Sequence, residues 1–129
     1  MNDFYQRIEE TGNFPQINSK TLENLRRSTA DNPAMLKEIF QSFIEDSEDL
    51  MREINDALNS NNNPMYASAV HSLKGLSGTI GCTRMFEILK LMDLLNKEEQ
   101  FEESRKGLDV LTVNFRELEQ VIESEIFSL

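Results

Sequence analysis

Apolar residues recur at alternating three- and four-residue steps along most of this chain, which is the spacing of one face of an α-helix. Four long runs of this kind follow one another. The first two begin at Asn32-Pro33 and Asn63-Pro64, each an N-cap residue followed by proline in the first helical turn. The first, third and fourth runs place on one face Leu36, Phe40, Phe43, Leu50, Ile54 and Ala57, then Met85, Ile88, Leu89, Met92 and Leu95, and finally Leu108, Leu111, Phe115, Leu118 and Ile122.

The connections between these runs are short and polar. The break from Asn59 to Asn63, for example, is short enough to force an antiparallel turn. Each apolar stripe must be buried against another element, and four stripes on antiparallel helices bury one another. The pattern therefore predicts an all-α fold, an antiparallel up-down-up-down four-helix bundle.

A short extra helix precedes the bundle. Asn18 or Ser19 caps a helix that runs to about Ser28. Residues 1–17 are interpreted as an N-terminal extension that forms a helical turn or two near its start before glycine and proline interrupt it. We therefore assign residues 18–129 to the bundle.

Composition and charge narrow the possible classes of protein. The chain has 129 residues, of which 39% are apolar and 28% charged, as in a single well-solvated helical domain. Its 23 acidic and 13 basic residues give a net charge of −10, which disfavours nucleic acid and anionic membranes as partners. Neither a bilayer-spanning apolar stretch nor a signal peptide is evident, and the single cysteine cannot form an internal disulfide. We expect a cytoplasmic monomer without membrane insertion.

His71, the only histidine, is predicted to point to solvent. On a helical wheel the second run has an apolar stripe about 120° wide, and His71 lies about 160° from its centre. Its neighbours on the outward face are the small residues Ala67, Gly75 and Gly78. Each glycine in a helix costs about 1 kcal/mol relative to alanine, so we interpret them as clearance for a large partner. The stripe consists of Tyr66, Ala69, Val70, Leu73, Leu76, Ser77 and Ile80.

The histidine belongs to the spaced pattern His71-x-x-Lys74-Gly75-x-Ser77-x-x-x-Gly81. Together with the apolar helical runs on both sides, this pattern resembles the signature of histidine-containing phosphotransfer (HPt) domains, the shuttle modules of bacterial and plant phosphorelays. The resemblance extends over most of the chain. It implies that His71 accepts a phosphoryl group from the aspartate of one receiver domain and donates it to the aspartate of another.

The residues near His71 have predicted roles of their own. A neutral imidazole nitrogen is a good nucleophile near pH 7. Lys74 lies at the i+3 position, so its ammonium would offset the charge of the phosphoryl group, whereas the ordinary alternative is a solvated surface lysine. Ser77 is expected on the buried side as a small packing residue, and Gly81 as a bend near the helix end.

Asp93 has two possible roles. His71 is ten residues before Gly81 and Asp93 twelve after it, so both lie about 15 Å from the turn of a helical hairpin. HPt-like proteins often have a glutamate or glutamine at this place, which implies that Asp93 accepts a hydrogen bond from the imidazole of His71 and orients it. The alternative is an ordinary carboxylate beside the apolar stripe.

Other chemistries fit the sequence poorly. Cys82, where the family usually has alanine or another small or apolar residue, is about 16 Å from His71 along a helix, too far for a Cys–His pair. One histidine without a second ligand in its turn predicts no metal site. No phosphate-binding glycine loop is present, so we expect a phosphoryl carrier without kinase activity. The resemblance implies no cofactor of its own, because the receiver domain supplies Mg²⁺.

Two functions of different classes remain. The first is a phosphorelay intermediate, either free-standing or part of a hybrid histidine kinase, with response-regulator receiver domains and a hybrid sensor kinase as partners. The second is a helical adaptor that binds receiver domains without phosphorylation. Intact His71, Lys74 and Gly75 favour the relay. We expect the receiver to cover the outward face of the histidine helix and the adjacent Pro33–Ser60 helix, where Ile44 and Met65 are apolar residues outside the core stripes.

Overall fold

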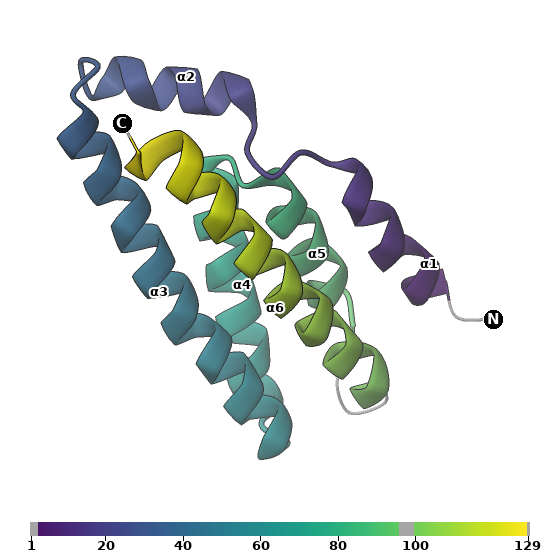
Figure 1. Cartoon of the computed structure of the whole chain (residues 1–129). Coiled ribbons are helices and arrows are strands. Elements are labelled where there is room, and N and C mark those ends of the chain that lie inside the picture. The colour runs from purple at the N-terminus through teal and green to yellow at the C-terminus, as the bar shows by residue number, and fades with distance from the viewer. Residues whose placement is uncertain (1–2, 96–99, 129) are drawn as a thin grey trace.

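The computed structural model describes residues 3–95 and 100–128, which contain six α-helices and no strand. Four of the helices form a bundle in which each packs on the next and the last closes against the first (Figure 1). Consecutive helices of this bundle run in opposite directions, and the predicted all-α bundle is confirmed. The helices are α1 (Asp3–Glu10), α2 (Ser19–Ser28), α3 (Pro33–Asn59), α4 (Asn63–Ile80), α5 (Thr83–Asp93) and α6 (Phe101–Ile122), which continues into a π-helical turn over Glu123–Phe127.

Asparagine caps begin three of these helices. The side chains of Asn18, Asn32 and Asn62 accept hydrogen bonds from backbone N–H groups in the first turns of α2, α3 and α4. The cap of α4 lies one residue earlier than the pattern indicated. Asn63 and Pro64 already occupy the first turn, where the missing N–H of proline leaves no helical bond unmade.

The N-terminal extension forms a helix that packs on the bundle. Phe4 and Ile8, four residues apart on α1, are buried, and α1 contacts α5 and α6. α2 packs against α4, and the backbone N–H of Asn18 donates to the carbonyl of Gly81 at 2.7 Å. The N-terminal helices therefore support the hairpin that joins α4 to α5.

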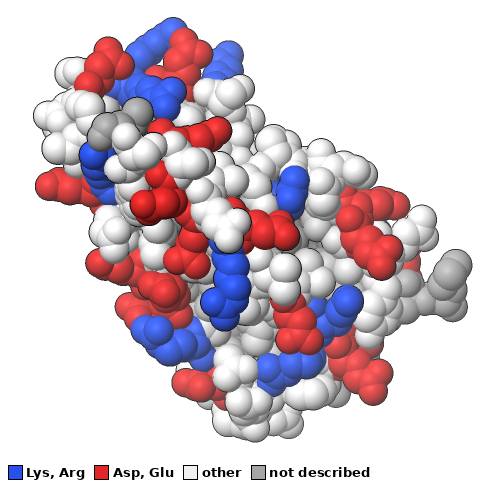
Figure 2. Space-filling view, viewed as in Figure 1, with Lys and Arg blue, Asp and Glu red and all other residues white. Residues whose placement is uncertain are grey.

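Figure 2 shows the side of the molecule on which α6 lies in front of α4. Acidic and basic side chains are interspersed over this side, so neither sign forms one continuous patch there. A groove between α3 and α6 is lined by charges of both signs, among them Glu48, Arg52, Arg105 and Glu119. None of the described helices is long and apolar enough to cross a membrane.

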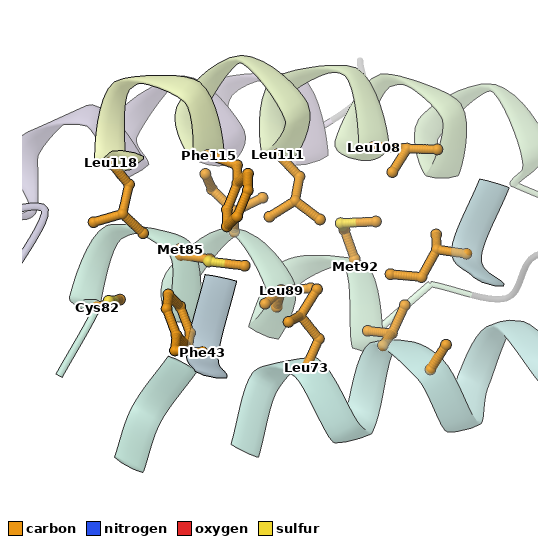
Figure 3. Close-up of a cluster of buried hydrophobic side chains, with 14 of the residues drawn as sticks. Phe43, Leu73, Cys82, Met85, Leu89, Met92, Leu108, Leu111, Phe115 and Leu118 are labelled. Carbon is orange, nitrogen blue, oxygen red and sulfur yellow. The ribbon is translucent and has the colours of Figure 1, made fainter. Parts of the chain in front are cut away.

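The core lies between the facing stripes of α3, α4, α5 and α6. In Figure 3, side chains of α6 point toward α5, with Phe43 of α3 and Leu73 of α4 on the opposite side of the cluster. Ile44 is only 8% exposed and belongs to this core, so it is not spare apolar surface as expected. α3 contacts both α4 and α6, and so it buries a wider stripe than one neighbour would require. The residues labelled in Figure 3 on α5 and α6 are Met85, Leu89, Met92, Leu108, Leu111, Phe115 and Leu118.

Candidate functional site

α4 packs between α3 and α5, and the described part of the chain leaves its outward face exposed around His71. His71 is exposed on this face, whereas its neighbours Val70 and Leu73 are 0% exposed, so the predicted orientation of the helix is confirmed. Within the described residues, the imidazole of His71 makes no hydrogen bond. Its ring is therefore presented to solvent on a helix whose other side is fixed by packing.

The two glycines near His71 have different surroundings. A Cβ atom built on Gly75 would meet no other heavy atom within 4 Å, so this position opens onto free space. A Cβ atom on Gly78 would lie 3.1 Å from Cδ1 of Phe86, a residue of α5. Gly78 therefore allows α5 to approach α4 closely, a role that the sequence analysis missed. The signal was the hairpin register, because Gly78 is three residues before Gly81 and Phe86 five after it.

Lys74 and Asp93 are brought together across the α4–α5 hairpin. The ammonium Nζ of Lys74 donates to Oδ2 of Asp93 at 2.7 Å, and their side chains are 24% and 28% exposed. Lys74 is thus paired with α5 and is not a freely solvated lysine. Asp93 accepts this bond, and no hydrogen bond joins it to His71 in the described structure. Its predicted role in orienting the imidazole stays a prediction.

Gly81 ends α4 in a conformation that suits glycine. Its φ of 82° lies in the left-handed region, and a Cβ atom there would lie 2.7 Å from the side chain of Thr21. Ser77, one turn earlier, is fully buried, and its hydroxyl donates to the carbonyl of Lys74 at 3.0 Å. Both residues have the structural positions that the pattern predicted, a bend and a packing contact. They fix the hairpin on which the Lys74–Asp93 pair depends.

Cys82 is unsuited to nucleophilic chemistry. Its side chain is fully buried, and burial raises the pKa of the thiol to about 12. At neutral pH it therefore stays protonated inside the bundle. Residues 3–95 and 100–128 contain no group of three or more His, Cys, Asp or Glu side chains that could hold a metal ion.

Comparison with known families agrees with this geometry. The model of the Hpt domain matches residues 38–124, more than half of the chain. The chain belongs to the Hpt domain family. The match includes α4, with His71, Lys74 and Gly75, and also Asp93 at the end of α5. Histidine phosphotransfer in phosphorelays is the role that this membership supports.

Solved structures share the fold of this Hpt domain. Histidine-containing phosphotransfer protein B (HptB) from Pseudomonas aeruginosa PAO1 is similar with a TM-score of 0.75 and 19% sequence identity, over 89% of this chain and 97% of that one. A rice protein, a candidate histidine-containing phosphotransfer protein, is similar with a TM-score of 0.71 and 17% identity, over 92% and 89% of the two chains. A search of curated proteins gave no match.

Proposed function

We propose that this Hpt domain carries a phosphoryl group on His71, which it takes from the aspartate of one receiver domain and passes to the aspartate of another. Family membership supports a histidine phosphotransfer role. The single observation that supports His71 as the carrier is its exposure on the uncovered face of α4, since it is the only histidine of the chain.

The proposed transfer needs little from the carrier. The lone pair of one neutral imidazole nitrogen attacks the phosphorus, and the bond between phosphorus and the aspartyl oxygen breaks, so the electron pair leaves with the carboxylate. The phosphohistidine then keeps its proton on the other ring nitrogen, and the total charge is unchanged. No base has to remove a proton before the attack. Donation to the second receiver follows the same step in reverse.

Two residues near His71 would assist the transfer, Lys74 by its positive charge and Gly75 by leaving room for the receiver domain. Lys74 is one turn from His71, so its ammonium would reach the phosphoryl oxygens. Gly75 keeps free space beside the imidazole, into which the receiver domain would fit. The receiver would supply Mg²⁺ and the other catalytic groups, so the Hpt domain would act as a carrier without kinase activity and without a cofactor of its own.

The docking surface would be the outward face of α4, around Ala67, Gly75 and Gly78, together with the adjacent side of α3. Partners would be response-regulator receiver domains and a hybrid sensor histidine kinase. Because relay partners must exchange, the interface would be small, at the low end of interface sizes. The net charge of −10 would discriminate among receivers more than it would add affinity.

Transfer from a labelled receiver tests this function. The domain is incubated with Mg²⁺ and receiver domains that have been phosphorylated beforehand, and then with a second, unphosphorylated receiver. We expect an acid-labile, alkali-stable label on the domain, which His71→Gln abolishes and which moves to the second receiver. Ser72→Ala, at the exposed neighbouring residue, is the matched control and should keep the label. Receiver binding without any label would instead indicate the adaptor function.

A further inference from the structure

The Lys74–Asp93 pair differs from the other described ion pairs. The pairs Arg27–Glu23, Arg52–Asp49 and Lys90–Glu87 each join two residues of one helix and include at least one side chain more than half exposed. Arg84–Glu117 joins α5 to α6 at 3.8 Å, with Glu117 58% exposed. Lys74–Asp93 joins two helices at 2.7 Å with both side chains less than a third exposed. Partial burial limits screening by water and salt, so this pair holds the Lys74 ammonium more firmly than a surface pair would.

Asp93 has one cationic partner among the described residues, and that partner is Lys74. The charge of Asp93 also acts on the phenol of Tyr66, whose pKa is raised mainly by burial, lowered in part by a hydrogen bond with Ser104, and raised further by Asp93. The carboxylate therefore lies at the α4–α5 contact, with the Lys74 ammonium 2.7 Å from its Oδ2. In the proposed function the Lys74 ammonium offsets the negative charge of the phosphoryl group. In the unphosphorylated domain this ammonium is already paired with the Asp93 carboxylate.

The ammonium of Lys74 has two possible anions within reach. In a helix, side chains three residues apart have Cβ atoms about 5–6 Å apart, and the lysine stem is long and flexible. A phosphoryl group on His71 would present three oxygens and a dianionic charge to the same ammonium. Any interaction with these oxygens must replace or share the bond to Asp93, so part of its stabilising effect is lost.

We propose that Asp93 is a positioning residue that competes with the phosphoryl group of His71 for Lys74. In the unphosphorylated domain Lys74 is bound to Asp93, and phosphorylation draws it toward His71. The competition makes phosphohistidine less stable than it would be beside an unpaired lysine, so the domain gives the phosphoryl group up more readily. This inference rests on the proposed function of His71.

The direction in which Asp93→Asn shifts the phosphoryl-exchange equilibrium distinguishes competition for Lys74 from orientation of the His71 imidazole. Asp93→Asn keeps the size of the side chain and removes its charge, so Lys74 becomes fully available to the phosphoryl group. The equilibrium with a receiver should then shift toward phosphohistidine by about two- to fivefold, the size typical of a partly exposed ion pair. If Asp93 instead oriented His71, the same variant would be phosphorylated more slowly and its equilibrium would not move toward phosphohistidine.

The experiment is a double-mutant cycle on the phosphoryl-exchange equilibrium with one receiver, using Asp93→Asn, Lys74→Ala and the double variant. We expect the shift caused by Asp93→Asn to disappear largely in the Lys74→Ala background, and Asp93→Glu to restore the wild-type equilibrium. Glu87→Gln, which removes the partner of Lys90 on the same helix, is the control and should leave the equilibrium unchanged. Melting curves of all variants establish that each is folded.

Three results would overturn the inference. An equilibrium of Asp93→Asn equal to that of the wild type, or shifted away from phosphohistidine, contradicts the competition. An equal shift with and without Lys74 shows that Asp93 acts by a route other than this lysine. Each of these leaves the proposed function intact because the wild type is still labelled. Absence of label on the wild-type domain overturns the proposed function and this inference together.

Discussion

His71 and Leu73 are two residues apart on α4, yet His71 is exposed and Leu73 is 0% exposed. The inward face of α4 is packed between α3 and α5, and the other residues that the structure describes leave its outward face exposed around His71. The packed face fixes the position of the helix backbone, and the open face presents the imidazole from that fixed position. Different residues of one helix therefore account for its stability and for the proposed chemistry, so a substitution can change one without the other.

The largest effect on stability is expected at Leu73. Leu73→Ala removes a fully buried side chain and should lower the free energy of unfolding by about 2–5 kcal/mol. His71→Gln, on the open face, should change it by less than about 0.5 kcal/mol. Urea unfolding of both variants measures the difference, and equal losses would show that the two faces are not distinct.

Among the small residues around His71, Gly75 should have the largest effect on the rate of transfer. Gly75→Gln should slow phosphorylation of His71 strongly, because a long side chain would enter the free space beside the imidazole. The same variant should be slightly more stable than the wild type, since glycine is a poor helix former. Rapid-quench kinetics with a phosphorylated receiver gives the rate. A rate equal to that of the wild type would contradict the role of this space in docking.

A pair of alanine substitutions compares the two glycines directly. Gly75→Ala should raise the free energy of unfolding by up to about 1 kcal/mol, because its Cβ atom meets nothing. Gly78→Ala should raise the free energy of unfolding by less, because its Cβ atom would lie 3.1 Å from Phe86 and the ring must move. Thermal or urea unfolding measures both values. An equal gain at the two sites would mean that Phe86 does not limit the approach of α5.

The smallest change in stability is expected for a substitution of Glu119, which lines the groove between α3 and α6. Burial raises the pKa of Glu119, Glu48 raises it further, and Arg116 opposes the shift. The folded state therefore holds this proton more tightly than the unfolded state, and the associated stability is present at acidic pH and lost as the pH rises through the Glu119 pKa. Glu119→Gln should be slightly more stable than the wild type at pH 7, with no gain at a pH below the ordinary glutamate range.

Unfolding at several pH values tests the Glu119 prediction. Phosphotransfer by Glu119→Gln should equal that of the wild type, because Glu119 lies in the α3–α6 groove and not on the outward face of α4. Lower stability at pH 7 would contradict the direction of the pKa shift. A loss of transfer would place part of the functional surface on this side.

Local features of the molecule were predictable from the sequence. Helix periodicity, the asparagine caps and the exposure of His71 depend on residues within one or two turns, and the structure has them with a shift of one residue at Asn62. Contacts between helices depend on the register and rotation of neighbouring helices, which one helical wheel does not contain. The Phe86–Gly78 contact, the burial of Ile44 and the docking of α1 were missed for this reason.

In the candidate site, too, local features were predictable from the sequence and the contacts between helices were not. The pattern around His71 predicted an exposed imidazole with a lysine one turn away, and both are present. The hairpin register placed Asp93 near the same level of α4 but did not determine which side chain it would meet. The structure pairs it with Lys74, three residues beyond His71. The relative rotation and register of two helices thus decide which side chain a carboxylate meets, and the sequence pattern of one helix does not contain them.

The most direct test of the account is to map the phosphoryl group after transfer from a phosphorylated receiver. The labelled domain is digested under alkaline conditions, which preserve phosphohistidine, and its peptides are sequenced by mass spectrometry. We expect the phosphoryl group on His71 and on no other residue. A phosphoryl group on Ser72 or Thr79, which are also exposed on α4, or a domain that binds the receiver and is never labelled, would contradict the central claim.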